Sequence, residues 1–294
     1  MKTALATYKL KIETPANIII HKLNKIFFGK KYANEKKYFK QFRLLKKKYL
    51  KNGIWDFNGI RLPEYHLDPL AELMYPIFMD TLFVYCSHND NYNSDLIDKL
   101  DEFLPEGAYG YVNEDIDVTV KENDIVIDAG AWIGDFSAYS SKKGASVYAF
   151  EPSLETIKLL KKTQELNKNI EIIEKGLGEF SGSVLMSNHS TNSGANRITN
   201  DATNSEKIEL TTIDEFVKEY KLEKVDFIKA DIEGSERNML KGATETLRRY
   251  SPKLAICTYH LTDDPIILRD IILDANPNYI IVQKKMKLYA SVKK

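Results

Sequence analysis

The pattern of apolar and polar positions changes character near residue 115. Beyond it, short apolar runs rich in β-branched residues alternate with longer segments whose apolar residues recur at i, i+3 and i+4. The runs predict strands and the longer segments predict helices, which together indicate a parallel sheet covered on both faces. The predicted strands are 125–129, 146–150, 170–173, 225–230, 253–258, 278–283 and 286–292. The predicted helices are one that begins near Phe136 and those at 156–167, 212–222, 236–250 and 265–275.

The last two predicted strands are separated only by Lys284 and Lys285. A parallel crossover needs about a dozen residues or more, so these two strands must form an antiparallel hairpin. The pattern therefore predicts an α/β fold, a doubly wound and mostly parallel seven-stranded sheet with a C-terminal antiparallel hairpin. We expect its one reversed strand to lie at an edge.

The first part of the chain lacks this alternation. Residues 1–51 have a helical pattern that ends at Asn52 and Gly53, and the stretch WDFNGIRL predicts a hairpin turning at Asn58 and Gly59. Further helices are predicted at 67–86, with a break at Pro76, and at 95–104. We therefore divide the chain into a mainly helical accessory region with a short hairpin, 1–110, and a sheet domain, 111–294.

Composition changes this picture little. Apolar residues make up 43% of the chain and charged residues 29%, as in ordinary globular proteins. Cys86 and Cys257 have no second cysteine at metal-ligand spacing, so they predict neither a zinc site nor a disulfide framework. No apolar run is long enough for a signal core or a membrane span. These features predict a cytoplasmic protein.

The formal net charge of zero hides an asymmetry. Residues 1–51 hold 15 Lys and Arg but two acidic residues, a net of +13, and the remainder carries −13. The basic segment either folds against the acidic remainder or attracts an acidic partner, such as an anionic lipid surface or a phosphorylated carrier. Nucleic acid is not favoured, because the aromatic positions in this segment recur at steps of three and four, as in the core stripe of an amphipathic helix. That stripe consists of Tyr38, Phe42, Leu45 and Tyr49.

The first candidate site lies in the stretch DIVIDAGAWIGDFS, where Gly130 and Gly134 separate a predicted strand from a predicted helix. Glycines allow a sharp turn there and let backbone amides approach a ligand. Seventeen residues beyond Gly134, Glu151 closes the next predicted strand, where a carboxylate can accept both hydrogen bonds of a ribose diol. An ordinary turn with a surface glutamate is the plainer alternative, but the two features together are more specific than either alone.

The spacing of the glycines also indicates the ligand. The dinucleotide motif GxGxxG is absent, and DxGxxxG lacks the third glycine that packs the helix beneath a pyrophosphate. This absence argues against a nicotinamide-dependent oxidoreductase. A ligand with a ribose but no diphosphate fits better, and S-adenosyl-L-methionine is such a ligand.

A second candidate site lies at the end of the fourth predicted strand, in VDFIKADIEGSERNMLKGA, where Lys229, Asp231 and Glu233 alternate. In an open α/β sheet this edge borders the ligand crevice, and packing alone does not explain a lysine and two acids there. His260 leaves the fifth predicted strand at the same edge, and both a structural role and a role near an acceptor are open for it. We expect Glu236 only to interact with a helix N-terminal dipole.

Together these stretches resemble the FkbM family of S-adenosylmethionine-dependent methyltransferases. The resemblance covers about residues 110–290 and is carried by DIVIDAGAWIGDFS, VYAFEPS, GLGEFSGSV, LTTIDEF and VDFIKADIEGSERNMLKGA followed by TYH. It implies a Rossmann-like class I methyltransferase fold and methylation of hydroxyl groups, often on sugars or natural products. The first 110 residues match less clearly, and we expect them to bear on acceptor choice or on homo-oligomer formation.

Carried over residue by residue, the resemblance places Asp128, Gly130 and Gly134 at the methionine end of the cofactor and Glu151 at its ribose. It places Lys229, Asp231 and Glu233 at the reaction edge. The expected cofactor-binding residues are Asp128, Gly130, Ala131, Trp132, Gly134, Glu151, Pro152 and Gly176. The expected catalytic residues are Asp231, Lys229, His260 and Glu233.

The sequence thus predicts an O-methyltransferase acting on a hydroxyl of a sugar, glycan or other small molecule. Asp231, or else His260, is the expected general base, and Lys229 would orient the carboxylates or meet an anionic acceptor. The asparagine-proline-aromatic-aromatic motif of amine methyltransferases is missing, which favours oxygen as the acceptor.

Three alternatives stay open. The HExxH metal motif is absent and we assign no metal ligand, but acids at the reaction edge that hold a divalent ion would be another way to activate a hydroxyl. A non-catalytic binding scaffold with this fold is a second alternative. The polar stretch 187–206, in which Arg197 is the single positive charge, is either a lid that contacts the acceptor or a loose insertion.

Overall fold

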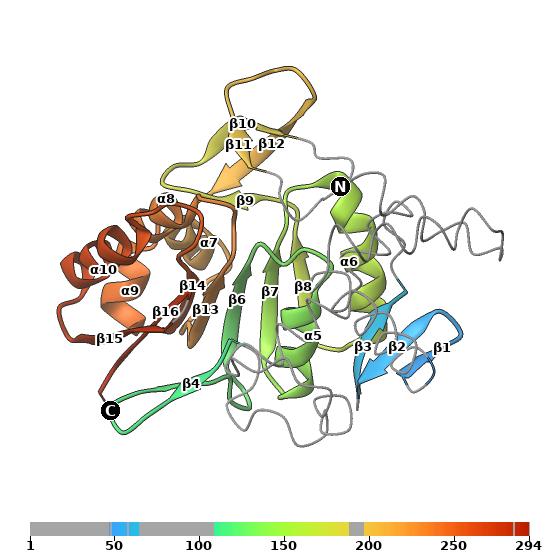
Figure 1. Ribbon diagram of the computed structural model, residues 1–294, viewed down its shortest axis with the longest axis horizontal. Coiled ribbons are helices and arrows are strands. Elements are labelled where there is room, and N and C mark those ends of the chain that lie inside the picture. Colours follow the sequence, from blue (N-terminus) through green and yellow to red (C-terminus); the bar gives the residue numbers. More distant parts are fainter. Residues whose placement is uncertain are drawn as a thin grey trace, which may run out of the picture.

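A seven-stranded sheet forms the centre of the computed structural model, which describes residues 47, 49–57, 59–64, 109–187, 197–284 and 286–293 (Figure 1). Its strand order is β15-β16-β14-β13-β6-β7-β8. The strands are β6 (Ile125–Ala129), β7 (Ser146–Phe150), β8 (Ile170–Ile173), β13 (Phe227–Ala230), β14 (Lys253–Cys257), β15 (Tyr279–Lys284) and β16 (Lys287–Val292). All seven predicted strands are present, and the predicted α/β fold class is confirmed.

The position of the reversed strand differs from the prediction. Strand β16 is the one that runs against the others, and it lies between β14 and β15 rather than at the edge. The chain therefore leaves a gap one strand wide beside β14 when it enters β15, and β16 returns to fill that gap. Burial agrees with this order, because Leu288, Tyr289 and Ala290 are at most 2% exposed, whereas most of β15 is partly exposed. The expectation of a reversed edge strand is wrong.

Helices cover both faces of the sheet. Alternate residues of a strand point to opposite faces, and in β6 Val126 faces one apolar core while Ile127 faces the other. The first core contains residues of α5 (Asp135–Lys142) and α6 (Leu154–Leu166). The second contains residues of α7 (Ile213–Glu219), α8 (Glu236–Lys241), α9 (Thr244–Tyr250) and α10 (Asp264–Ala275). Among the described residues, no helix has the length and apolar character needed to cross a membrane.

The helix predicted over 236–250 is two helices, α8 and α9, which meet at Gly242. A Cβ atom at Gly242 would lie 2.1 Å from the carbonyl oxygen of Gly178, so this position must be glycine for the two backbones to approach. The Gly242 carbonyl accepts a hydrogen bond from the backbone N–H of Asp214 in α7. The close approach explains why a continuous helical pattern is interrupted here.

A small three-stranded sheet precedes the central one. It consists of β1 (Leu50–Lys51), β2 (Ile54–Phe57) and β3 (Ile60–Pro63). Strands β2 and β3 pair antiparallel, which confirms the predicted hairpin. The helix expected to run to residue 51 is wrong at its end, because Leu50 and Lys51 pair with β2 and the φ angles of Asn52 (52°) and Gly53 (74°) form a hairpin turn. Most of that predicted helix, and those at 67–86 and 95–104, lie outside the described residues.

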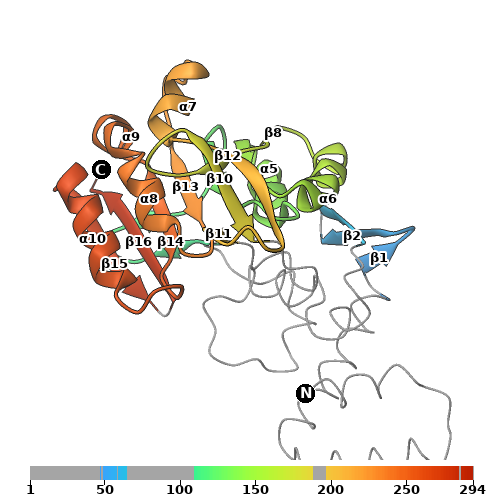
Figure 2. The same cartoon turned by 90° about the horizontal axis from the view of Figure 1, so that it is seen from above.

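This hairpin shares a core with the central sheet. Trp55 is 2% exposed and Leu62 is 0% exposed, and both belong to the apolar cluster that contains Phe136 of α5 and Leu160 of α6. Figure 2 shows β1 and β2 (blue) beside α6. The hairpin thus packs as part of the helical layer over the sheet, whereas the assignment of 1–110 as an accessory region stays a prediction.

A second sheet, which the sequence pattern did not predict, has the strand order β11-β10-β12-β9. Its strands are β9 (Gly176–Leu177), β10 (Gly182–Ser187), β11 (Ile198–Thr199) and β12 (Ser205–Thr211). Figures 1 and 2 show β10, β11 and β12 above one end of the central strands. A short ribbon of β4 (Tyr111–Val112) and β5 (Asp117–Val118) completes the strands. Of the stretch predicted to be a lid or insertion, residues 188–196 lie outside the described part of the chain.

Replacing Leu62 by alanine should lower the free energy of unfolding by about 2–5 kcal/mol, because it removes a fully buried side chain from the shared core. Urea denaturation followed by circular dichroism measures this change. The control is Arg61→Ala on the opposite face of β3, where the side chain is 53% exposed and its ion pair with Asp56 contributes at most about 1 kcal/mol. Equal stability of the Leu62 variant and the wild type would show that the hairpin is not part of the core.

Candidate active site

The turn after β6 is built on two glycines with left-handed backbone angles. Gly130 has a φ of 72°, and a Cβ atom there would lie 2.1 Å from the carbonyl oxygen of Asp231. Gly134 has a φ of 86°, and its Cβ would lie 2.7 Å from Cδ1 of Leu160 in α6. Glycine is required at both positions by backbone angle and by close approach. The first contact presses the ends of β6 and β13 together.

A buried ion pair supports this turn from beneath. The Asp128 Oδ1 and Lys229 Nζ atoms are 3.0 Å apart, and the two side chains are 0% and 4% exposed. Lys229 also donates to the Gly130 carbonyl (2.7 Å), and the Ser137 hydroxyl donates to Asp128 Oδ2 (2.6 Å). Burial by itself lowers the pKa of Lys229, but the Asp128 carboxylate raises it above its ordinary value. Lys229 is therefore a fixed cation beneath the turn.

Glu151 ties the end of β7 to the same turn. Its Oε2 accepts the backbone N–H of Trp132 (3.0 Å) and its Oε1 accepts that of Ser153 (2.9 Å). Trp132 has a φ of 49°, which is uncommon for a residue other than glycine. The Glu151 residue is 8% exposed, and burial raises its pKa to about 7. Each carboxylate oxygen keeps a further lone pair with which to accept a hydrogen bond from a ligand.

A pocket opens at the carboxyl ends of β6, β7 and β13. Five of the predicted cofactor residues line it, namely Gly130, Trp132, Glu151, Pro152 and Gly176. Asp128, Ala131 and Gly134 do not line the pocket. They affect its shape only through the turn after β6, which they form or support.

The second sheet supplies the outer wall of this pocket. Met186, Ile208 and Leu210 pack together as a small apolar cluster, and all three line the pocket. Arg197, whose backbone pairs with Ser187 at the end of β10, lines it as well. The apolar wall was not predicted from the sequence, although the alternation of Ile208 and Leu210 with acidic and basic residues was a signal for a half-buried strand.

The turn after β13 brings acids to the other end of the pocket. Asp231 and Glu233 both line it, with side chains 24% and 28% exposed. The Tyr109 hydroxyl donates to Asp231 Oδ2 (3.0 Å), and the Tyr259 hydroxyl donates to Oδ1 (2.8 Å). Burial raises the pKa of both tyrosines, so both remain neutral donors near pH 7. Two donors from different parts of the chain thus orient the Asp231 carboxylate.

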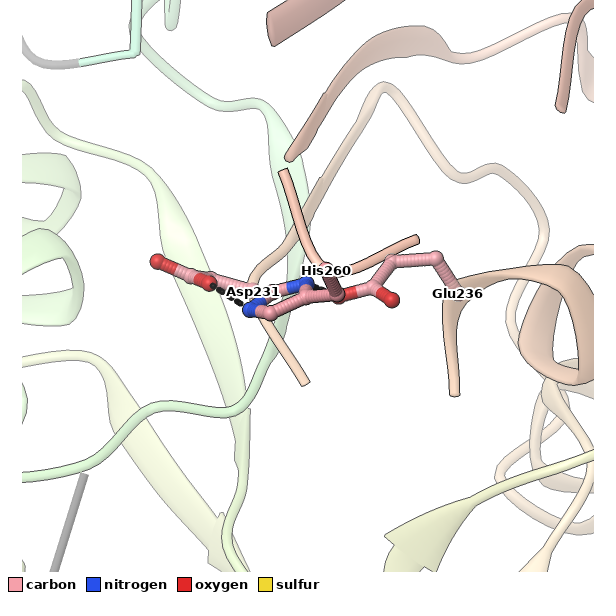
Figure 3. A group of neighbouring side chains, drawn as sticks. All are labelled: Asp231, Glu236 and His260. Carbon is pink, nitrogen blue, oxygen red and sulfur yellow. Dashed lines mark ion pairs between the residues drawn. The ribbon is translucent and has the colours of Figure 1, made fainter. Parts of the chain in front are cut away.

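His260 lies behind these acids, with a side chain 8% exposed. Its Nε2 is 3.6 Å from both Asp231 Oδ1 and Glu233 Oε2, and its Nδ1 is 3.0 Å from Glu236 Oε1. Figure 3 shows the imidazole between the carboxylates of Asp231 and Glu236. Burial by itself lowers the pKa of His260, but the Glu233 and Glu236 carboxylates raise it to about 10. With no further ligand, the imidazole therefore carries a proton near pH 7.

Glu236 has a larger role than the helix-dipole interaction expected of it. It is fully buried, and its carboxylate accepts the backbone N–H groups of Ile232 (2.8 Å) and Gly234 (3.0 Å). It thereby holds the turn in which Glu233 (φ 53°) and Gly234 (φ 98°) are left-handed. This role was not predicted. The only signal in the sequence was that Glu236 follows Asp231 and Glu233 closely in the stretch DIEGSE.

The sheet order, the glycine turn after β6 and the acid after β7 together define a class I methyltransferase fold. A family model described as the methyltransferase FkbM domain matches residues 128–279, just over half of the chain. The chain belongs to the FkbM methyltransferase domain family.

Individual relatives share only parts of their length with this chain. The hexuronic acid methyltransferase AglP of Haloferax volcanii is 29% identical over 147 residues, which are 49% of this chain and 59% of that protein. The crystal structure of methyltransferase FkbM from Methylobacillus flagellatus is 25% identical, with a TM-score of 0.44, over 57% of this chain and 43% of that one. Fibrillarin from Aeropyrum pernix, solved with S-adenosyl-L-methionine bound, is 13% identical with a TM-score of 0.39 and coverages of 60% and 70%.

Replacing Glu151 by glutamine should change how stability depends on pH. The pKa of Glu151 is raised from 4.5 to about 7, so the stability that its proton contributes is complete below pH 4.5 and is lost as the pH rises to 7. The unfolding free energy of the wild type, relative to Glu151→Gln, should therefore fall by about 3 kcal/mol over that interval.

Urea denaturation of both proteins at several pH values, without added ligand, measures this difference. The matched control is Glu155→Gln in α6, whose side chain is 68% exposed and should show no such trend. A constant difference between the wild type and Glu151→Gln from pH 4.5 to 7 would contradict the assignment of a buried, proton-binding Glu151.

Proposed function

We propose that this chain is an S-adenosylmethionine-dependent O-methyltransferase whose acceptor is a hydroxyl of a sugar or related small molecule. One observation carries the proposal: a single pocket joins the glycine turn and Glu151 at one end to Asp231 and Glu233 at the other. Membership of a methyltransferase family supports the reaction class. The chain matches only 59% of the length of its curated relative, so we argue the reaction from the residues of the site.

The cofactor end of the pocket suits a nucleoside joined to an amino acid. Glu151 has lone pairs left for a ribose diol after accepting two backbone amides. The glycine at position 130 lets this turn pack directly against the Asp231 backbone, which brings the two ends of the pocket together. Leu177, Ile208 and Leu210 offer apolar surface of the kind that a flat base requires.

S-adenosylmethionine would supply a methyl group already activated by a sulfonium. In the transfer, the C–S bond breaks and a C–O bond forms to the acceptor, whose hydroxyl proton must pass to a base. Asp231 is the carboxylate best oriented to take it, since it lines the pocket and two tyrosine donors hold it. His260 is a poorer base, because its pKa is raised to about 10 and the nitrogen is already protonated near pH 7.

Lys229 contributes to the reaction by holding the turn in place and not by contacting the acceptor. Its Nζ is engaged by Asp128 and by the Gly130 carbonyl and lies outside the pocket lining. We propose that it fixes the turn that receives the cofactor. This arrangement leaves the recognition of an anionic acceptor to another residue.

Arg197 suits that recognition. It lines the pocket, and within the described residues its side chain pairs with no carboxylate. A free guanidinium there would bind a carboxylate on the acceptor through two parallel hydrogen bonds. A hexuronic acid is such an acceptor, and the name of the relative from Haloferax volcanii supports this sugar class.

Calorimetry should detect S-adenosylmethionine binding to the wild type and no binding to Gly130→Ala, in which the new Cβ meets the Asp231 backbone. Gly53→Ala is the matched control, because Gly53 is also left-handed but has no atom within 4 Å of its added Cβ. Both variants carry the strain of a left-handed backbone angle, but Gly130→Ala should also be less stable because its added Cβ meets the Asp231 backbone, so binding is measured at a temperature where urea denaturation shows both variants to be folded. If the wild type does not bind the cofactor, the chain is a scaffold and not an enzyme.

Incubation with S-adenosylmethionine labelled in its methyl group, together with a panel of neutral sugars, hexuronic acids and lipid-linked glycans, tests the acceptor. We expect label to enter a hexuronic acid or a glycan that contains one. Arg197→Ala should raise KM for an acidic sugar more than for a neutral one, since the lost contact is to the carboxylate. Preference for the neutral sugar in the wild type would contradict the role of Arg197.

Asp231→Asn should reduce kcat by about 10²–10⁴-fold, since the amide cannot accept the hydroxyl proton. Binding of S-adenosylmethionine, measured by calorimetry, should remain. Tyr259→Phe, which removes one donor to Asp231, should have an effect of about tenfold, as expected for one hydrogen bond. Full turnover by Asp231→Asn would exclude Asp231 as the base.

A further inference from the structure

We propose that Asp231, Glu233 and His260 bind a divalent cation at the edge of the pocket, with Glu236 holding the imidazole from its other side. Binding of the cation stands independently of the proposed function. Its use in methyl transfer rests on that function.

The cluster has an excess of negative charge. Asp231, Glu233 and Glu236 contribute three carboxylates around one imidazole. The neighbouring basic side chains of the described structure are engaged elsewhere, Lys229 by Asp128 and Arg237 by Asp263 and Asp264. Even with a protonated imidazole, the formal charge of the group is −2, which a divalent cation would balance.

The distances suit metal ligands better than hydrogen bonds. Nε2 of His260 is 3.6 Å from Asp231 Oδ1 and from Glu233 Oε2, which is long for a hydrogen bond. Ligand atoms that surround a metal at about 2.0–2.2 Å are separated from one another by about 3.0–3.6 Å. A cation beside Nε2 would therefore be within reach of one oxygen from each carboxylate once the Glu233 side chain, 28% exposed, moves toward Asp231.

The imidazole itself gives an independent indication. Its side chain is more than nine-tenths buried, yet Nε2, the nitrogen that faces Asp231 and Glu233, has no hydrogen-bond partner of good geometry within the described residues. The side chains of Asp231, Glu236 and His260 place ligand atoms within 4.8 Å of one another, and Glu233 adds an oxygen 3.6 Å from Nε2 without belonging to that group. Figure 3 shows how the ring presents one nitrogen to Asp231 and the other to Glu236.

The surroundings resemble the outer layer of a metal site. Metal-bound histidines commonly place their second nitrogen against a carboxylate, and Glu236 Oε1 lies 3.0 Å from Nδ1. Ligating carboxylates are themselves hydrogen-bonded, as Asp231 is by Tyr109 and Tyr259. One imidazole with two carboxylates suits Mn²⁺ or Zn²⁺.

The location gives the cation a role. Asp231 and Glu233 line the pocket, whereas His260 and Glu236 do not, so the open side of a bound cation would be the side of the two pocket-lining carboxylates. A cation there would lower the pKa of a coordinated hydroxyl, whose proton the second oxygen of Asp231, not bound to the cation, would accept.

The test is binding of Mn²⁺ to the full chain after removal of metal with a chelator, measured by calorimetry and electron paramagnetic resonance near pH 7.5. We expect one saturable site. His260→Gln and Glu233→Gln should abolish it, and Glu236→Gln should weaken it by about 10–100-fold, as for other outer carboxylates. Asp263→Asn, in the neighbouring acidic pair that binds Arg237, is the control and should bind Mn²⁺ as the wild type does.

Pulsed electron paramagnetic resonance of Mn²⁺ on the wild type should also show coupling to a histidine nitrogen, which keeps the test valid if a variant fails to fold. Three outcomes would overturn the inference: no saturable binding, no such coupling, or unchanged binding by His260→Gln. The imidazole would then bind a proton in place of a metal ion. Methyl transfer is measured separately, so an active enzyme that binds no Mn²⁺ refutes the cation alone. An inactive chain that binds Mn²⁺ refutes only the proposed reaction.

Discussion

The rest of the site depends on the buried ion pair between Asp128 and Lys229. The pair joins neighbouring central strands, and Lys229 also donates to the Gly130 carbonyl. The lysine ammonium group therefore holds both the sheet and the turn above it. Removal of one partner from such a pair leaves an uncompensated buried charge, at a typical cost of about 3–5 kcal/mol. The pair therefore links the stability of the core directly to the shape of the ligand pocket.

The two ends of the pocket are in contact through the backbone. Gly130 lies so close to the Asp231 carbonyl that no side chain fits between them. A shift of the β6 turn must then move the β13 turn as well, and with it the Asp231 carboxylate that lines the pocket. Under the proposed function, this contact would keep the methyl donor and the acceptor at a fixed separation, which is the main requirement when the methyl group is already activated.

Much of the fold and the site could be predicted from the sequence, for identifiable reasons. The central strands are short β-branched runs buried on both faces, and this signal is strong. The meeting of Gly130 and Glu151 in one pocket was predictable because a glycine turn after the first strand and an acid after the second lie at the same carboxyl edge of such a sheet, whereas their binding of a cofactor stays a prediction. The order of β15 and β16 was not, because a short connection requires an antiparallel pair but does not say which strand lies inside.

Other parts depended on contacts between distant segments. Tyr109 reaches Asp231 across 122 residues, and no local pattern indicates such a donor. Glu236 looked like an ordinary first-turn acid, and only the fold shows that it is buried against His260. The second sheet was missed because β9 and β11 have only 2 residues each and because the polar stretch 187–206, interpreted as a lid or insertion, contains β11 and the start of β12.

The outer wall of the pocket and the strand ends beneath it belong to two separate sheets. Strands β10 and β12 pair with each other and β12 pairs with β9, while the other residues that line the pocket include those in the turns after β6, β7 and β13. Changes of length or sequence in the β10–β12 connection would thus remodel the outer wall without disturbing the strand ends beneath it. Such an architecture lets a fixed donor site be matched to acceptors of different size by exchanging one peripheral ribbon.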